Sequence, residues 1–301
     1  MYVPFFSKKE VKRLYKRKGG GGRGSKGSGG GGGGVSSSGS GSRGGSVSRP
    51  LSGSTGGRSG TITSYGSGGG RSSTIPAGQL FAGRSQGGGT RNQVFGSQTY
   101  GSGYPSVSGG RGVAGLGFPF IFWPIVWGGG LGYGASYLHD REYGDENNSS
   151  RPGGAMQQTA FKDSGSNNTF HLLADNETVL SLIDSVVSNC TVGNSTVLVP
   201  MPLNSSDPSS PRPEQAIQYY RASSVVLTLD GYNNTAALSN DSSIPNTPLP
   251  SWTNQTFLDC LNQTIGAAVP LVDSGNGASL TTPSVGLLGL IWVLALSHLI
   301  S

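Results

Sequence analysis

Glycine dominates one long stretch of this chain and limits what that stretch can fold into. Residues 19–111 hold 34 glycines in 93 positions, and serine and arginine make up much of the remainder. Such a segment buries too little apolar surface to offset the entropy lost on ordering, so we expect residues 19–73 to be disordered. Apolar residues return from Thr74 onward. Residues 74–111 are therefore expected to be partly ordered, with a short strand near 93–100.

The folded part is expected downstream, at residues 155–272. Asp175 or Asn176 can cap a helix whose apolar residues recur with a period of 3.6 as far as Cys190. Thr253 can cap a last helix of the same kind.

Between these two helices the pattern changes. Pro213 opens a further candidate helix over 214–221, and the β-branched run 223–229 predicts a strand that ends at a turn. The expected fold class is α+β: a small disulfide-closed domain after a long disordered Gly/Ser/Arg-rich segment, with a C-terminal hydrophobic helix.

Asn-X-Ser/Thr sequons are confined to residues 147–262. Of the 14 asparagines in this stretch, 11 are in sequons, whereas chance placement would give about three at its Ser/Thr frequency of about 24%. The sequon asparagines are Asn147, Asn148, Asn167, Asn176, Asn189, Asn194, Asn204, Asn233, Asn240, Asn254 and Asn262. The sequence therefore predicts N-glycosylation and a luminal, then extracellular, module.

Charge divides the chain as sharply as the sequons do. Residues 1–111 carry a formal charge of +15, and residues 112–301 carry −9. The basic segment, which begins with residues 1–18, could hold anionic cell-wall or matrix polymers through charge, with a strength that falls as salt rises. Its Arg-Gly spacing is also found in RNA-binding segments, but a glycosylated neighbour argues against a nucleic-acid partner.

The chain has two cysteines, Cys190 and Cys260, both inside the sequon-rich stretch. In an oxidising compartment two cysteines in one small domain favour a disulfide. Closing a loop of this size stabilises the fold by about 4 kcal/mol in the chain-entropy treatment. Their separation matches no zinc spacing, so we expect no metal and no cofactor.

The C-terminal region has the order of a GPI-attachment signal. Small residues and a polar spacer occupy 273–284, and the uncharged apolar run 285–300 follows, too short to cross a bilayer comfortably. Residue size favours Asn276 as the attachment position, and spacer length favours Ser274. A tail-anchored or buried terminal helix is the alternative. We therefore predict that the protein binds a membrane, either through this C-terminal tail or through a lipid anchor.

A second apolar segment, 112–138, contains the run FPFIFWPIVW at 118–127. One interpretation is a signal anchor near 113–138, which would explain the basic residues before it, the sequons after it and the lack of a leader at Met1. The other is an aromatic element packed on the downstream domain. Pro119, Pro124 and many glycines favour packing, because proline and glycine weaken a lone membrane helix.

No catalytic constellation is visible. His171 lies in a predicted strand, Asp230 precedes a turn glycine, and Glu214 and Asp259 sit near helix ends, where carboxylates are common. We therefore do not expect an enzyme.

Four strings carry a family resemblance: GGGTRNQVFGSQTYGSGYP at 87–105, GVAGLGFPFIFWPIVWGGGLGYG at 112–134, RPGGA at 151–155 and YYRASSVVLTLDGYNNT at 219–235. Together they resemble an uncharacterised family of fungal Gly-rich, membrane-associated or secreted surface proteins. The resemblance covers about 74–272 and implies a cell-surface setting, with no activity to carry over.

The expectation is a cell-surface glycoprotein with a structural or adhesive role, anchored by GPI. A single-pass receptor or sensor with a cytosolic basic tail is the alternative, and an extracellular polysaccharide-active enzyme is a third class without residue evidence.

Overall fold

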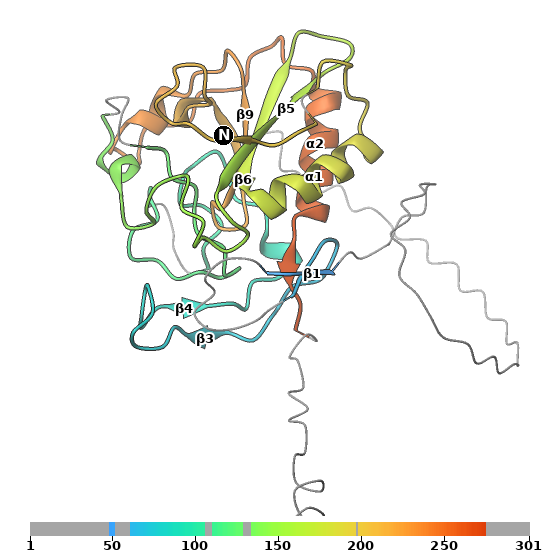
Figure 1. Ribbon diagram of the computed structural model, residues 1–301. Coiled ribbons are helices and arrows are strands. Elements are labelled where there is room, and N and C mark those ends of the chain that lie inside the picture. The colour runs from blue at the N-terminus through green and yellow to red at the C-terminus, as the bar shows by residue number, and fades with distance from the viewer. Residues whose placement is uncertain (1–47, 52–60, 106–109, 129–133, 197, 275–301) are drawn as a thin grey trace, which may run out of the picture. The chain divides into compact units, whose positions relative to one another are not determined.

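An antiparallel five-stranded sheet forms the centre of the module (Figure 1). The computed structural model describes residues 48–51, 61–105, 110–128, 134–196 and 198–274, all within the compact unit Arg43–Ser301. The strand order is β7-β5-β6-β9-β8. The strands are β5 (Met156–Lys162), β6 (Thr169–Asp175), β7 (Met201–Pro202), β8 (Ala216–Tyr220) and β9 (Val225–Leu229). Every neighbouring pair runs antiparallel.

Two helices of equal length pack on one face of this sheet: α1 (Asn176–Asn189) and α2 (Gln255–Ala268). The Asp175 side chain accepts a hydrogen bond from the Thr178 amide and begins α1, as expected from the sequence. The cap of α2 is Asn254, one residue later than predicted, because its side chain accepts from the Phe257 amide. Both helices bury the apolar stripe that the 3.6-residue period predicts, although Leu180 and Val187 remain exposed.

The second face of the sheet is covered by irregular chain instead of helices. Residues of 100–143 pack there against Leu173 of β6, Tyr219 of β8 and Val226 of β9. Since both faces are covered, all five residues of β9 are buried and its sequence VVLTL is almost continuously apolar.

The remaining elements are short. They are β1 (Ser48–Pro50), β2 (Thr61–Thr63), β3 (Ser73–Thr74), β4 (Ser85–Gln86), β10 (Leu271–Val272) and the 3-10 turns η1 (Arg91–Gln93), η2 (Ser136–His139), η3 (Pro213–Gln215) and η4 (Thr235–Leu238). β2 pairs with β1 on one side and with β10 on the other, which joins the glycine-rich region to the end of the module.

The structure corrects two boundaries. The helix predicted at 214–221 is the single turn η3 followed by strand β8, because Ala216, Tyr219 and Tyr220 gain pairing with β9 and burial that local propensity does not report. The order boundary at Thr74 lies too late, since residues 61–73 belong to the fold. Gly68 shows why: it has φ of 70°, and a Cβ there would lie 2.6 Å from the Gly89 carbonyl oxygen. At such glycines, segments without regular secondary structure pack backbone against backbone, which a side chain would prevent.

The disulfide predicted between Cys190 and Cys260 is confirmed, with 5.8 Å between the Cα atoms. Cys190 caps the C-terminus of α1 and Cys260 lies inside α2, so the bond joins the two helices. The module is therefore a mixed α and β structure closed by one disulfide.

The aromatic run 118–127 contains no helix, and most of its side chains are buried in the two hydrophobic clusters. In the described residues no helix is long and apolar enough to span a bilayer. The hydrophobic helix predicted at 285–300 and the attachment position Asn276 lie outside the described residues, whereas Ser274 is described and exposed.

Candidate functional site

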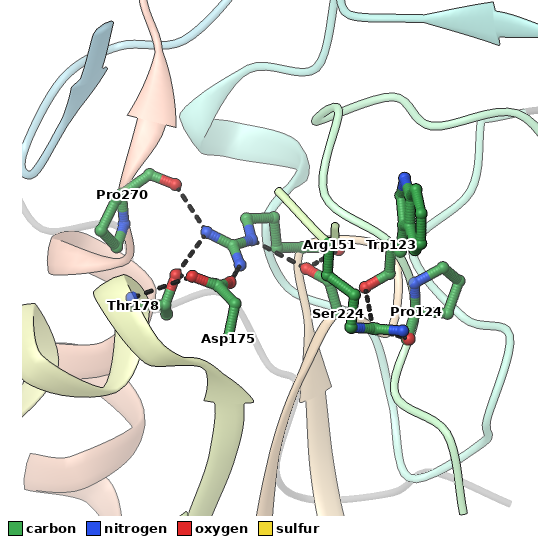
Figure 2. Close-up of polar contacts among 8 residues, drawn as sticks. Trp123, Pro124, Arg151, Asp175, Thr178, Ser224 and Pro270 are labelled. Carbon is green, nitrogen blue, oxygen red and sulfur yellow. Dashed lines mark hydrogen bonds and ion pairs between the residues drawn. The ribbon is translucent and has the colours of Figure 1, made fainter. Parts of the chain in front are cut away.

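A fully buried arginine, Arg221, occupies the end of the β8–β9 hairpin. Its guanidinium donates to the Asp175 carboxylate at 2.5 Å, to the Thr178 hydroxyl at 2.9 Å and to the Pro270 carbonyl at 3.0 Å (Figure 2). Its carbon Cζ lies 3.4 Å from the centroid of the Phe122 ring. Burial lowers the pKa of Arg221, and the Asp175 charge opposes that shift. The pair thus ties the aromatic run to α1 and to the chain after α2.

The backbone that carries Arg221 is strained. Arg221, Ala222 and Ser223 have φ of 50°, 48° and 58°, the left-handed region that residues with a Cβ rarely adopt. Each such residue costs about 1–2 kcal/mol. All three are buried, and backbone bonds from Arg221 N to Val94 O (2.7 Å) and from Ile125 N to Ser223 O (2.8 Å) hold the turn from outside.

A second buried arginine, Arg151, binds carbonyl oxygens alone. It donates to Trp123 O at 3.1 Å and to Pro124 O at 2.5 Å (Figure 2). It also donates to Tyr143 O at 3.2 Å. Its guanidinium also lies over the Trp123 ring, 5.6 Å from the centroid. Burial lowers the pKa of Arg151 to about 10, so the group remains charged at neutral pH. This cation satisfies carbonyls that an irregular segment cannot pair with its own amides.

A third arginine, Arg91, performs the same role for the glycine-rich region. It donates to Gly66 O at 2.8 Å and to Val269 O at 2.5 Å, and burial lowers its pKa to about 10. The three arginines lie in three of the four strings quoted above, which identifies those strings as the places where irregular chain is joined to the sheet and helices. Sequence reasoning missed all three, because their neighbours along the chain share no pattern: Thr90 and Asn92 flank Arg91, Ser150 and Pro152 flank Arg151, and Tyr220 and Ala222 flank Arg221.

The sequon asparagines all lie at the surface. None of the eleven is buried: Asn147, Asn167, Asn189, Asn194, Asn204, Asn233 and Asn240 are exposed, and Asn148, Asn176, Asn254 and Asn262 are half-buried. Of the three asparagines in the stretch that are outside sequons, Asn168 and Asn234 are buried. Asn168 accepts a hydrogen bond from the Asn254 amide, and Asn234 accepts one from the Thr247 amide. The buried asparagines of this stretch are thus all outside the sequons.

Several sequon asparagines also have side-chain contacts: Asn189 Nδ2 donates to Ser185 O at 2.7 Å, and Asn240 Oδ1 accepts from the Ser136 amide at 2.9 Å. Asn254 caps α2 through its side-chain oxygen, and its Nδ2 donates to Asp163 Oδ2 at 2.6 Å. Asn262 Oδ1 accepts from the Tyr220 hydroxyl at 2.8 Å. Burial opposes the charged form of Asp163, yet hydrogen bonds from Ser166 and Asn254 lower its pKa overall.

A polar cavity of about 360 Å³ lies between η2, the loop before β5 and the loop after β7. Asp140, Asp145, Glu146 and Ser205 are among its lining residues. Burial raises the pKa of Asp140, whereas Glu146 accepts hydrogen bonds from Ser205. The sequon residue Asn147 lines the same cavity, so a glycan there would stand at its rim.

The other titratable residues of interest do not converge. His171 Nε2, near the start of β6, lies 3.2 Å from Asp230 Oδ1, while Glu214 lies in η3 and Asp259 on the exposed side of α2. Within the described ranges no group of three His, Cys, Asp or Glu side chains could hold a metal ion.

Comparison with known proteins adds no assignment: no family model, no curated protein and no solved structure matches this chain.

Proposed function

We propose that this protein is a cell-surface glycoprotein, held at the membrane by a GPI anchor, with a structural or adhesive role. The observation that carries the proposal is the division of asparagines: all eleven sequon residues reach the surface, while two of the three others are buried. The Cys190–Cys260 disulfide supports an oxidising compartment. The basic residues 1–111 would bind anionic wall or matrix polymers outside the cell.

Exposure and contacts lead us to expect different occupancies among the sequons. Exposed Asn167 leaves room for a glycan, whereas both amide atoms of half-buried Asn254 are engaged in the α2 cap and the Asp163 contact. We expect Asn254 to be less occupied than Asn167. The test is to treat the full chain from a eukaryotic secretory host with an N-glycosidase in ¹⁸O-water and to map the labelled aspartates by mass spectrometry.

Asn167→Gln and Asn254→Gln form a matched pair. Asn167→Gln should increase mobility on a gel by one glycan, and Asn254→Gln should leave mobility unchanged. A chain from that host with no glycan on any sequon would refute the surface proposal.

The anchor is tested at the mature C-terminus. A phosphatidylinositol-specific phospholipase should release the protein from membranes, and the terminal peptide should end at Asn276 or Ser274. Peptides from 287–301 in the mature surface protein would contradict cleavage.

Topology is tested with external protease. The buried side chains of 118–127 support packing over a signal anchor, because anchoring would remove them from the core. Trypsin added to intact cells should then cleave at the Lys and Arg residues of 1–47, which precede the described fold, and protection of this segment would instead support the single-pass alternative.

A further inference from the structure

The β8–β9 turn places two peptide bonds under strain. Three consecutive non-glycine residues are left-handed, so the Arg221–Ala222 and Ala222–Ser223 bonds each have such a residue on both sides. Of the two, only the Ala222–Ser223 bond is followed by a residue with a hydroxyl group. Strain of this kind persists only where surrounding structure over-determines it, and it gathers at functional positions. The surrounding hydrogen bonds to Val94 and Ile125 prevent the turn from relaxing.

A nucleophile lies directly after the strained carbonyl. The Ser223 hydroxyl oxygen accepts a hydrogen bond from the Gly101 amide at 3.0 Å and donates to Ser102 O at 3.3 Å. The donated amide hydrogen bond favours the anionic form of this oxygen and so assists its attack.

The neighbouring Ser224 hydroxyl also has two hydrogen bonds, so the strain, and not the hydrogen bonding, distinguishes the two serines. Ser224 Oγ accepts from Arg221 Nε and donates to Arg221 O, both at 2.8 Å. The left-handed run ends at Ser223. The Ser223–Ser224 bond therefore has a left-handed residue on one side only, whereas the Ala222–Ser223 bond has one on both sides. Chemistry and strain therefore coincide at the Ala222–Ser223 bond.

We propose that this turn cleaves its own backbone between Ala222 and Ser223. Ser223 Oγ attacks the Ala222 carbonyl carbon, the C–N bond breaks, and the hydroxyl proton passes to the departing Ser223 nitrogen, which leaves an ester. Water then hydrolyses the ester, forms the Ala222 carboxylate and restores the Ser223 hydroxyl. Gly101, Ser102 and Gly103 lie against the turn, so displacement of this loop admits the water.

The two products stay together after the cut. β8 and β9 remain paired on either side of it, and Cys190 and Cys260 lie on opposite products. Cleavage is therefore silent on a non-reducing gel and appears once the disulfide is reduced and the sheet is denatured.

The test uses the full chain purified from a eukaryotic secretory host. We expect one band without reductant and two fragments with it, and terminal sequencing of the smaller fragment should begin at Ser223. Hydroxylamine, which cleaves esters, should increase the cut fraction. A single reduced full-length band that hydroxylamine does not change, from protein whose disulfide is intact, would overturn the proposal.

Three variants separate nucleophile from strain. Ser223→Ala should abolish the cut, and Ser223→Cys should retain it through a thioester. Ala222→Gly keeps the nucleophile but accepts the left-handed region freely, so cleavage should slow by about tenfold or more. Cutting of Ser223→Ala at the same bond would show an external protease, and an unchanged rate in Ala222→Gly would refute the role of strain. Each variant is compared only in protein whose Cys190–Cys260 bond has formed. If Ser223→Ala fails to fold, retained cleavage in Ser223→Cys tests the nucleophile in its place.

Discussion

The two faces of the central sheet are covered in opposite ways. On one face α1 and α2 bury regular apolar stripes and satisfy their own backbone groups. On the other face irregular chain from 100–143 supplies rings from Phe118, Trp123 and Trp127, in contact with Tyr143 and Tyr219. Both coverings exclude water, yet only the helical one is self-sufficient in hydrogen bonds.

The irregular face obtains the missing donors from side chains. The Tyr100 hydroxyl donates to Ile125 O and the Tyr143 hydroxyl to Val113 O, both at 2.5 Å. Arg151 donates to three further carbonyl oxygens. Aromatic residues with a polar atom and buried arginines therefore replace the helix ladder, which explains why this part of a glycine-rich chain is folded.

Loss of Arg221 should have the largest effect, because this residue joins the two coverings. Arg221→Met leaves Asp175 buried without its cation, so the free energy of unfolding should fall by about 3–5 kcal/mol. Arg71→Met, at an exposed arginine, is the control and should change it by less than about 0.5 kcal/mol. Urea denaturation of both variants measures the difference, and equal midpoints would contradict the assigned role.

The helical face is tested by removing the disulfide. Cys190→Ser with Cys260→Ser should lower the free energy of unfolding by about 4 kcal/mol, since the bond closes a sequence separation of 70. The same denaturation experiment on the intact and reduced unsubstituted protein is the control. A loss below about 1 kcal/mol would mean that helix packing alone holds this face.

The irregular face is tested at its closest backbone approach. Gly101 has φ of 95°, and a Cβ there would lie 2.1 Å from the Gly112 carbonyl oxygen. Gly101→Ala should therefore destabilise the fold by roughly 2 kcal/mol. Gly110→Ala, where a Cβ meets nothing within 4 Å, is the matched control. Indistinguishable melting curves for the two variants would show that this face tolerates added side chains.

The α2 cap gives a smaller effect. Asn254→Gln should cost about 1 kcal/mol, because glutamine positions its amide poorly for the Phe257 amide, while exposed Asn167→Gln should cost almost nothing. Thermal unfolding of deglycosylated protein compares them. A larger loss in Asn167→Gln would contradict the cap assignment.

The smallest effect depends on pH. Because the pKa of Asp163 is lower in the fold than its unfolded value of about 3.9, its contribution is complete above that value and is lost as pH falls through the folded pKa. Asp163→Asn should flatten the decline in stability below about pH 4. Exposed Asp184→Asn is the charge-matched control, and an equal slope in both variants would contradict this assignment.

Much of the helical face could be predicted. The period of Val179, Ile183 and Val186 reports which side of α1 is buried, and two cysteines in an oxidising setting leave one pairing. The strand β8 could not be predicted, since Glu214 and Gln215 after Pro213 favour a helix start and only pairing with β9 reverses that preference.

The sequence by itself determined what depends on neighbours along the chain: helix stripes and caps within a residue, the β9 strand, the disulfide and the placement of sequons. Tertiary structure alone decided what depends on distant partners. The structural role of Arg221 depends on its contacts with Asp175 and Phe122, and the need for glycine at position 101 depends on the close approach of Gly112. A buried charge and a left-handed turn are stable only once those partners are in place. The spacing of apolar residues along the chain gives no information about such distant partners.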